Sequence, residues 1–286
     1  MSAKEVSTSQ GDSKTYVLKM PDEIEFYHMA NGITRRDSRL CLEEYAPKFN
    51  WWRTNARVLD IGTCDGSVTE ILSRYLPSDY EVLLGADIQP KAIKFANEKY
   101  GNKRIKFIHL NIEKDIPDNL KNSFDHVYSF FTFHWVDDHE KAFTNVYNLL
   151  EKNGEFFSIF FTFSDVYFVF EILSKTKKWG PWMNDFQKFP SPYYDFEDPD
   201  VYVSKLLRKI GFNVLDVRCK QRVYYYENIE IMRGILTAIS PFNIPKDLWP
   251  EFLDEFIETQ RSMKLIDESK GTVKTHYNLM VIHCTK

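Results

Sequence analysis

The sequence lacks the features that mark several classes of protein. Its four cysteines form neither a C-x-x-C pair nor a metal-ligand spacing. No run of 18 apolar residues argues for a membrane span, and residues 1–20 lack the apolar core of a signal peptide. A net charge of −4 provides no basic field for nucleic acid. We therefore predict a cytoplasmic protein with reduced thiols and no metal, which binds neither membrane nor nucleic acid.

Apolar and aromatic residues are plentiful. They make up 43% and 16% of the chain, which supports a packed core and leaves material for an apolar ligand cavity. Candidates for the wall of such a cavity, with ordinary core packing as the alternative, are residues 128–133 and 156–163 with Tyr167, Phe168, Trp179 and Trp182. Residues 1–20 are polar and are predicted to be a disordered tail.

Apolar strands and helical patterns alternate through the first half of the chain. Predicted strands are 57–61, 81–87, 105–110, 124–131 and 154–163, and predicted helices are 21–48, 67–75, 91–100 and 140–150. This alternation is typical of βαβ units, and it predicts a parallel sheet buried on both faces.

After residue 163 the alternation ends. We predict helices and loops over 164–200 and a helical insert over 229–264, which together cap the open end of the sheet. A helix over 201–210, a strand over 212–218 and a closing strand over 277–284 complete the pattern. Residues 21–286 are therefore predicted to be one α/β domain with a helical cap.

The first strand runs into a glycine turn, Asp60-x-Gly62-x-x-x-Gly66. Glycines at such a turn allow positive φ angles and let the backbone approach a ligand. Asp87 ends the second strand about 20 residues later, where an acid accepts hydrogen bonds from both ribose hydroxyls. The alternative role for Asp87 is a helix cap or loop acid.

This turn is not the dinucleotide-binding pattern, because G-x-G-x-x-G is absent. An acid directly after the strand suits a cationic ligand better than a pyrophosphate. Together with Asp87 and the alternating strands, the turn indicates a protein that binds S-adenosylmethionine, a sulfonium.

The chain resembles the insect juvenile hormone acid methyltransferases from about Phe26 onward. The matching segments are Arg36-Asp37, Cys41-Leu-Glu-Glu44, Val58-Leu-Asp-Ile-Gly62, Asp65-Gly-Ser-Val-Thr69, Phe124-Asp-His-Val127, His134-Trp135, Ala142-Phe143, Asn148-Leu-Leu150, Ser191-Pro-Tyr193, Glu197-Asp-Pro199 and Ser240-Pro-Phe-Asn-Ile-Pro-Lys-Asp247. The last of these is the most specific, because no general methyltransferase pattern requires it.

The resemblance implies a Rossmann-like, seven-stranded class I methyltransferase sheet. It also implies methyl transfer from S-adenosylmethionine to the carboxylate of a small lipophilic acid, juvenile hormone acid or farnesoic acid. The implied cofactor-binding residues are Asp60, Gly62, Cys64, Gly66, Asp87, Ile88, Asn111, Ile112 and Ser129. The implied catalytic residues are Trp135, whose indole N–H suits a carboxylate oxygen, with Thr34 and His134. From the sequence alone, a buried core aromatic is the favoured interpretation of Trp135, and for His134 a hydrogen bond to a backbone carbonyl is as well supported as a place at the cofactor.

Three ligand-facing positions depart from the family pattern. The family has glycine where Cys64 stands, glutamine as a second carboxylate anchor where Thr34 stands, and an acid for the adenine amino group where Asn111 stands. Two alternatives therefore remain beside the leading hypothesis: a methyltransferase for another small acceptor, and a non-catalytic paralogue that binds a ligand or partner. The sequence does not indicate the oligomeric state.

Overall fold

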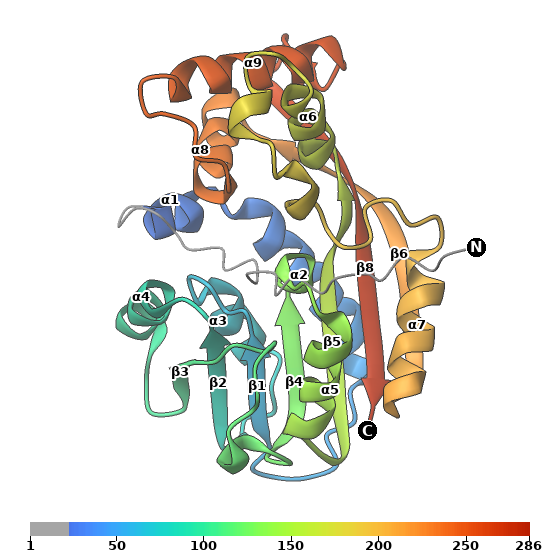
Figure 1. Ribbon diagram of the computed structural model, residues 1–286. Coiled ribbons are helices and arrows are strands. Elements are labelled where there is room, and N and C mark those ends of the chain that lie inside the picture. Colours follow the sequence, from blue (N-terminus) through green and yellow to red (C-terminus); the bar gives the residue numbers. More distant parts are fainter. Residues whose placement is uncertain (1–22) are drawn as a thin grey trace, which may run out of the picture.

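A computed structural model describes residues 23–286 (Figure 1), so the predicted tail over 1–20 lies outside the described residues. Its central feature is an eight-stranded sheet of order β3-β2-β1-β4-β5-β8-β6, with the short β7 paired to β8. The strands are β1 (Arg57–Ile61), β2 (Val82–Asp87), β3 (Ile105–His109), β4 (Phe124–Phe130), β5 (Leu150–Ser164), β6 (Asn213–Tyr226), β7 (Ile266–Asp267) and β8 (Thr272–Thr285). The family resemblance implies seven strands, and the two-residue β7 is the additional eighth strand.

The sheet is parallel from β3 to β5 and antiparallel at β8 and β6. The parallel sheet predicted from the first half of the chain is therefore confirmed, and the later strands β6 and β8, for which no direction was predicted, are antiparallel. Strands β6 and β8 also extend beyond the predicted 212–218 and 277–284. Alternate residues of β6 are charged or exposed, so its apolar signal ends before its hydrogen-bonded ladder does.

The helices follow the predicted order with two corrections. They are α1 (Glu23–Ala30), α2 (Gly32–Tyr45), α3 (Ser67–Ser73), α4 (Pro90–Tyr100), α5 (His139–Leu149), α6 (Asp165–Ser174), α7 (Pro199–Ile210), α8 (Ile229–Ile239) and α9 (Trp249–Ser262), with 3₁₀ turns η1 (Ala46–Lys48), η2 (Asp118–Leu120), η3 (Phe133–Trp135), η4 (Gly180–Trp182) and η5 (Phe186–Lys188). The single helix predicted over 21–48 is interrupted at Asn31, and the insert over 229–264 is two helices. Pro241 and Pro245 lie between those two helices, where their missing N–H groups disfavour a continuous helix.

Two apolar layers cover the sheet, and a separate cap closes its upper end (Figure 1). Helices α5 and α7 bury one layer, and α2 and α3 bury the other. The cap is formed by α6, α8, α9 and the loop over 175–198, and it has its own aromatic core. Trp179 and Tyr167 are buried in this core, whereas Phe168 and Trp182 are each 41% exposed. None of these four aromatics lines the cavity at the carboxyl ends of β1, β2 and β4, and packing within the cap core accounts for the buried pair.

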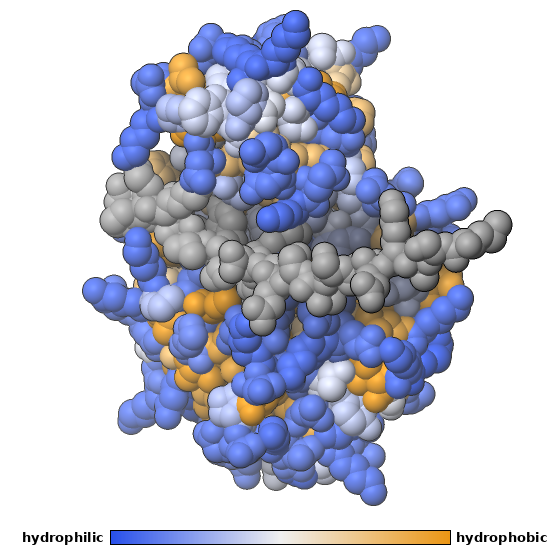
Figure 2. Space-filling model, viewed as in Figure 1, coloured by the Kyte–Doolittle hydropathy of each residue, from blue (hydrophilic) through white to orange (hydrophobic). Residues whose placement is uncertain are grey.

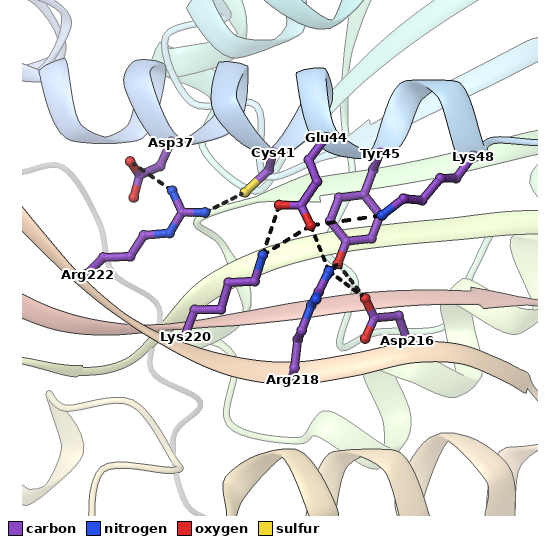
Figure 3. Close-up of polar contacts among 9 residues, drawn as sticks. All are labelled: Asp37, Cys41, Glu44, Tyr45, Lys48, Asp216, Arg218, Lys220 and Arg222. Atoms are coloured by element: carbon purple, nitrogen blue, oxygen red, sulfur yellow. Dashed lines mark hydrogen bonds and ion pairs between the residues drawn. The ribbon is translucent and has the colours of Figure 1, made fainter.

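Helix α2 is tied to the edge strand β6 by a ladder of polar contacts (Figure 3). Lys220 Nζ lies 2.9 Å from Glu44 Oε2, and Arg222 Nη1 lies 3.5 Å from the fully buried Asp37 Oδ1. The Glu44 carboxyl has a lowered pKa, chiefly because it accepts a hydrogen bond from Lys220. The buried end of this ladder helps to hold α2 in one position, which matters because α2 also reaches the candidate site.

A buried polar cluster lies on the same side of the sheet, centred on Glu155 of β5. Its carboxylate is paired with His283 Nε2 at 2.8 Å and His126 Nδ1 at 3.3 Å, and it accepts the Asn50 N–H at 2.9 Å. Although burial opposes ionisation, the two nearby histidines and the Asn50 N–H lower the pKa of Glu155 to about 2. The ionised carboxylate therefore stabilises the folded protein.

We expect Glu155→Leu to lower the free energy of unfolding by about 3 kcal/mol, because it removes charged hydrogen bonds and leaves buried donors unpaired. Since the folded pKa is depressed, the contribution of Glu155 is present above pH 4.5 and is lost as the pH falls towards 2. Urea unfolding at pH 7 and pH 3 checks both statements. The exposed Glu258→Gln is the control, and a loss below about 1 kcal/mol for Glu155→Leu would contradict the prediction.

Hydrophilic side chains cover most of the face seen in Figure 2, with smaller hydrophobic areas between them. Over residues 23–286, no helix has the length and apolarity needed to cross a membrane. The same residues hold no group of three or more His, Cys, Asp or Glu side chains placed to bind a metal ion.

Candidate active site

A cavity that is partly open to solvent lies at the carboxyl ends of β1, β2 and β4. Strand β1 pairs with β2 on one side and with β4 on the other. The order in which successive strands lie along the sheet therefore reverses at β1. Such switch points are the usual ligand sites of open α/β sheets. Helices α1, α2 and α8 contribute Tyr27, Asn31, Thr34, Ala238 and Ile239 to the lining.

The glycine turn after β1 forms one wall. Gly62 has φ +77°, and its N–H and that of Thr63 both donate to the Ala86 carbonyl, at 2.7 and 3.1 Å. A Cβ on Gly62 would collide with the Thr132 side chain. Gly66 also has positive φ (+79°), and a Cβ there would lie 2.9 Å from Ala96 Cβ. Gly66 is thus required for the turn and its packing but does not line the cavity.

Cys64 occupies a backbone conformation that favours glycine. Its φ is +46°, and its N–H donates to Asp87 Oδ2 at 2.9 Å. The side chain packs beside Ile24 and Ala92 while also bordering the cavity. Burial, with Asp87 and Asp65 nearby, raises the pKa of the thiol well above its usual range. The turn therefore accommodates cysteine as a neutral thiol, at the cost of a strained φ.

We expect Cys64→Gly to raise the free energy of unfolding by about 1 kcal/mol or less, because glycine removes the penalty of a side chain at positive φ. Its affinity for S-adenosylhomocysteine should stay within about threefold of the natural protein. The contrasting variant Cys64→Val places a β-branched residue at positive φ and should lose about 1–3 kcal/mol. Thermal unfolding and calorimetric titration measure both effects, and equal stability of the two variants would refute the strain argument.

Carboxylates dominate the polar lining. Asp60, Asp65, Asp87 and Glu113 all border the cavity, and its described lining contains no lysine or arginine. Asp65 is paired with His28 Nδ1 at 2.6 Å and with Arg35 at 3.3 Å. Burial raises the pKa of Asp60 to about 7 and also raises the pKa of Asp87. A bound cation would favour the ionised form of both, so the cavity is electrostatically matched to a cationic ligand.

The β2 and β3 ends supply the residues predicted for the nucleoside. Asp87 Oδ1 also accepts the Gln89 N–H at 2.9 Å, so both carboxylate oxygens are held by backbone donors. Asn111 Oδ1 accepts the Glu113 N–H at 2.9 Å, so the carbonyl oxygen predicted to meet adenine already has one donor. Ile88 and Ile112 line the same part of the cavity.

The opposite wall is formed by aromatic and small apolar side chains. Trp135 lies on η3, directly after β4, and its ring packs 5.8 Å from that of Phe189 in the cap. Phe131 lines the cavity with φ +55°, and its N–H donates to the Ile159 carbonyl at 2.7 Å. The Thr34 hydroxyl lies 3.4 Å from the Asn31 carbonyl. The cavity lining thus combines aromatic and apolar side chains with the carboxylates.

Besides Gly66, two more sequence-predicted residues, Ser129 and His134, lie outside this lining. Ser129 is fully buried and donates to the Ile61 carbonyl at 2.9 Å, so it joins β4 to β1. His134 is buried between Trp135 and Phe161, with ring centroids 5.0 and 5.2 Å away. Contributions from Tyr27, Asn31, Ala238 and Ile239 were not predicted. No local pattern marks them, because they reach the cavity only through the packing of α1, α2 and α8.

Comparisons with known proteins agree with this geometry. Residues 59–158 match the family model described as a methyltransferase domain. The chain is 39% identical over 268 residues to juvenile hormone acid O-methyltransferase of Bombyx mori, covering 92% of this chain and 96% of that protein. It is 32% identical over 252 residues to the Drosophila melanogaster protein of the same name, covering 85% and 84%.

Solved structures show the same fold at low sequence identity. Phosphoethanolamine N-methyltransferase 2 of Haemonchus contortus superposes with a TM-score of 0.56 and 15% identity, covering 93% of this chain and 58% of that one. The YcgJ protein of Bacillus subtilis superposes with a TM-score of 0.54 and 16% identity, covering 86% and 97%. These neighbours support the class I methyltransferase fold, and the two insect relatives show that the chain belongs to the juvenile hormone acid O-methyltransferase family.

Proposed function

We propose that this protein methylates the carboxylate of juvenile hormone acid or farnesoic acid, with S-adenosylmethionine as the methyl donor. The observation that supports this most directly is a single cavity whose lining holds the carboxylates, the glycine turn, Trp135, Thr34 and several apolar side chains. The names of the two insect relatives point to the same reaction. A cytoplasmic location stays a prediction.

The cavity fits the methyl donor in charge and in donor chemistry. Asp87 is placed to accept hydrogen bonds from ribose hydroxyls, and Asn111 and Ile112 border the space assigned to adenine. Gly62 and Cys64 form the turn beside the ligand, and Asp60 adds negative charge. When bound, S-adenosylmethionine supplies a methyl group on a positively charged sulfur, which the acidic lining favours.

The protein's own residues need only bind, orient and shield the acceptor. A carboxylate is already ionised near neutral pH, so the reaction requires no general base. The Trp135 indole N–H, an uncharged donor, can hold one carboxylate oxygen by a hydrogen bond, which leaves the other oxygen as the nucleophile. Phe131, Ala238 and Ile239 offer apolar contact for a hydrocarbon chain. Orientation of two reactants in this way supplies roughly 7–11 kcal/mol of a barrier.

Thr34 favours a second candidate, a methyltransferase for a different small acceptor. Its hydroxyl already donates to the Asn31 carbonyl, 3.4 Å away. A threonine in this position is shorter than the glutamine of the family pattern and presents no amide donor. Thr34 therefore offers an acceptor one amide donor fewer than the family pattern provides.

The test is product analysis by chromatography and mass spectrometry after incubation with S-adenosylmethionine and a panel of acids. Methyl esters of juvenile hormone acid or farnesoic acid, formed faster than those of fatty or aromatic acids, would support the leading proposal. Preference for another acid would support the second. Tight binding of S-adenosylhomocysteine without any methylated product would favour a non-catalytic ligand-binding paralogue.

A further inference from the structure

Asn31 has an unusual environment for a residue at the start of a helix. It is the N-cap of α2, and asparagine in this position ordinarily accepts a backbone N–H with its side chain. Here the side chain makes no capping hydrogen bond. It is 1% exposed, it borders the cavity, and its Oδ1 atom has no hydrogen-bond partner. A buried acceptor that does not cap its helix and faces a cavity is a candidate ligand contact.

The surrounding hydrogen bonds determine which way the Asn31 amide is oriented. The Ser67 hydroxyl donates its proton to Asp65 Oδ1 at 2.8 Å and accepts from Arg35 Nε at 3.1 Å. Ser67 therefore has no proton left for Asn31 and can only accept from Nδ2, which lies 3.5 Å away. Reversing the amide would bring two acceptors together. The network thus leaves Oδ1, an acceptor, as the atom without a partner.

The chemistry of the two ligands decides which of them this acceptor suits. An ionised carboxylic acid has no donor at its reacting end, so it offers Oδ1 nothing. S-adenosylmethionine carries donors on adenine, on the ribose and at its α-ammonium group. The first two are assigned to Asn111 and Asp87, at the ends of β3 and β2. Asn31 comes instead from the corner between α1 and α2 and is bonded towards Ser67, at the start of α3.

We propose that Asn31 Oδ1 accepts a hydrogen bond from the α-ammonium group of S-adenosylmethionine. The assignment rests on the proposed placement of the ribose at Asp87 and is independent of the identity of the acceptor acid. It explains why this side chain leaves its helix uncapped, since the amide is used to bind the amino acid end of the cofactor. Asn31 is thereby a cofactor-binding residue that connects α2 to the glycine turn.

Calorimetric titration of the full chain with two ligands tests the proposal. One is S-adenosylhomocysteine, and the other is its analogue with hydrogen in place of the α-amino group. Asn31→Leu should weaken S-adenosylhomocysteine about tenfold or more and change the affinity for the deaminated analogue less than about twofold. Equal weakening of both ligands would assign Asn31 a structural role and overturn the proposal, as would no weakening of either.

A second variant keeps the test decisive if Asn31→Leu does not fold. Asn31→Asp retains an acceptor and adds a negative charge, so the preference for the ligand with the ammonium group should rise severalfold above that of the natural protein. An unchanged or smaller preference would refute the assignment. Because the readout is binding without an acceptor acid, the result does not depend on carboxyl methylation. The binding experiment can therefore support the role of Asn31 even if the protein methylates no carboxylic acid.

Discussion

Replacement of Trp135 by phenylalanine is expected to lower kcat/KM for the preferred acid about a hundredfold and to leave the affinity for S-adenosylhomocysteine within about threefold. Phenylalanine keeps the aromatic contact with Phe189 but removes the indole N–H that we assign to the carboxylate. A hydrogen bond to a charged group is worth about 1.5–3 kcal/mol, which is one to two orders of magnitude in rate.

The measurement combines steady-state kinetics with calorimetric titration. Trp182→Phe is the matched control, because Trp182 lies on η4 in the cap, 41% exposed, and does not line the cavity. Unchanged kcat/KM in Trp135→Phe would show that the indole N–H is not used. A parallel loss of cofactor affinity would show instead that Trp135 shapes the whole cavity.

Replacement of Asp87 by alanine is expected to lower the affinity for S-adenosylhomocysteine about a hundredfold or more. The variant removes the acceptor assigned to two ribose hydroxyls, and it also releases the N–H groups of Cys64 and Gln89, both held at 2.9 Å. The second effect loosens the glycine turn, so the melting temperature should fall as well. Asp87→Asn keeps the size of the side chain, so its affinity for S-adenosylhomocysteine should lie between those of Asp87→Ala and the natural protein.

An analogue that lacks the ribose 2′-hydroxyl separates the two effects of Asp87. The natural protein should bind this analogue more weakly than S-adenosylhomocysteine. Asp87→Ala should bind the two ligands with nearly the same affinity. If the hydroxyl still contributes fully in the alanine variant, the carboxylate supports the turn only. Such a result would require another ribose partner.

The cofactor turn was predictable because its chemistry is local in sequence. Gly62 and Gly66 adopt the positive φ angles that the turn requires, and Asp87 ends β2, so parallel pairing with β1 brings it to the same edge. Whether the turn accommodates a cysteine at position 64 could be decided only from the tertiary structure. Its φ of +46° confirms that a glycine conformation is needed there, yet its Cβ and Sγ pack partly against Ile24 and Ala92. Only the tertiary structure shows that the Cys64 side chain has space on the side of Ile24 and Ala92.

The sequence by itself determined the βαβ order, the class of fold and the wall of the cavity that follows β1 and β2, because these depend on neighbouring residues and on strand direction. Tertiary structure alone decided the rest. Asn31 and Ile239 are more than 200 residues apart and meet at the cavity through helix packing. The same packing leaves Ser129 and His134 outside the lining. Helix positions depend on buried contacts summed over the whole cap and sheet, which no short stretch of sequence contains.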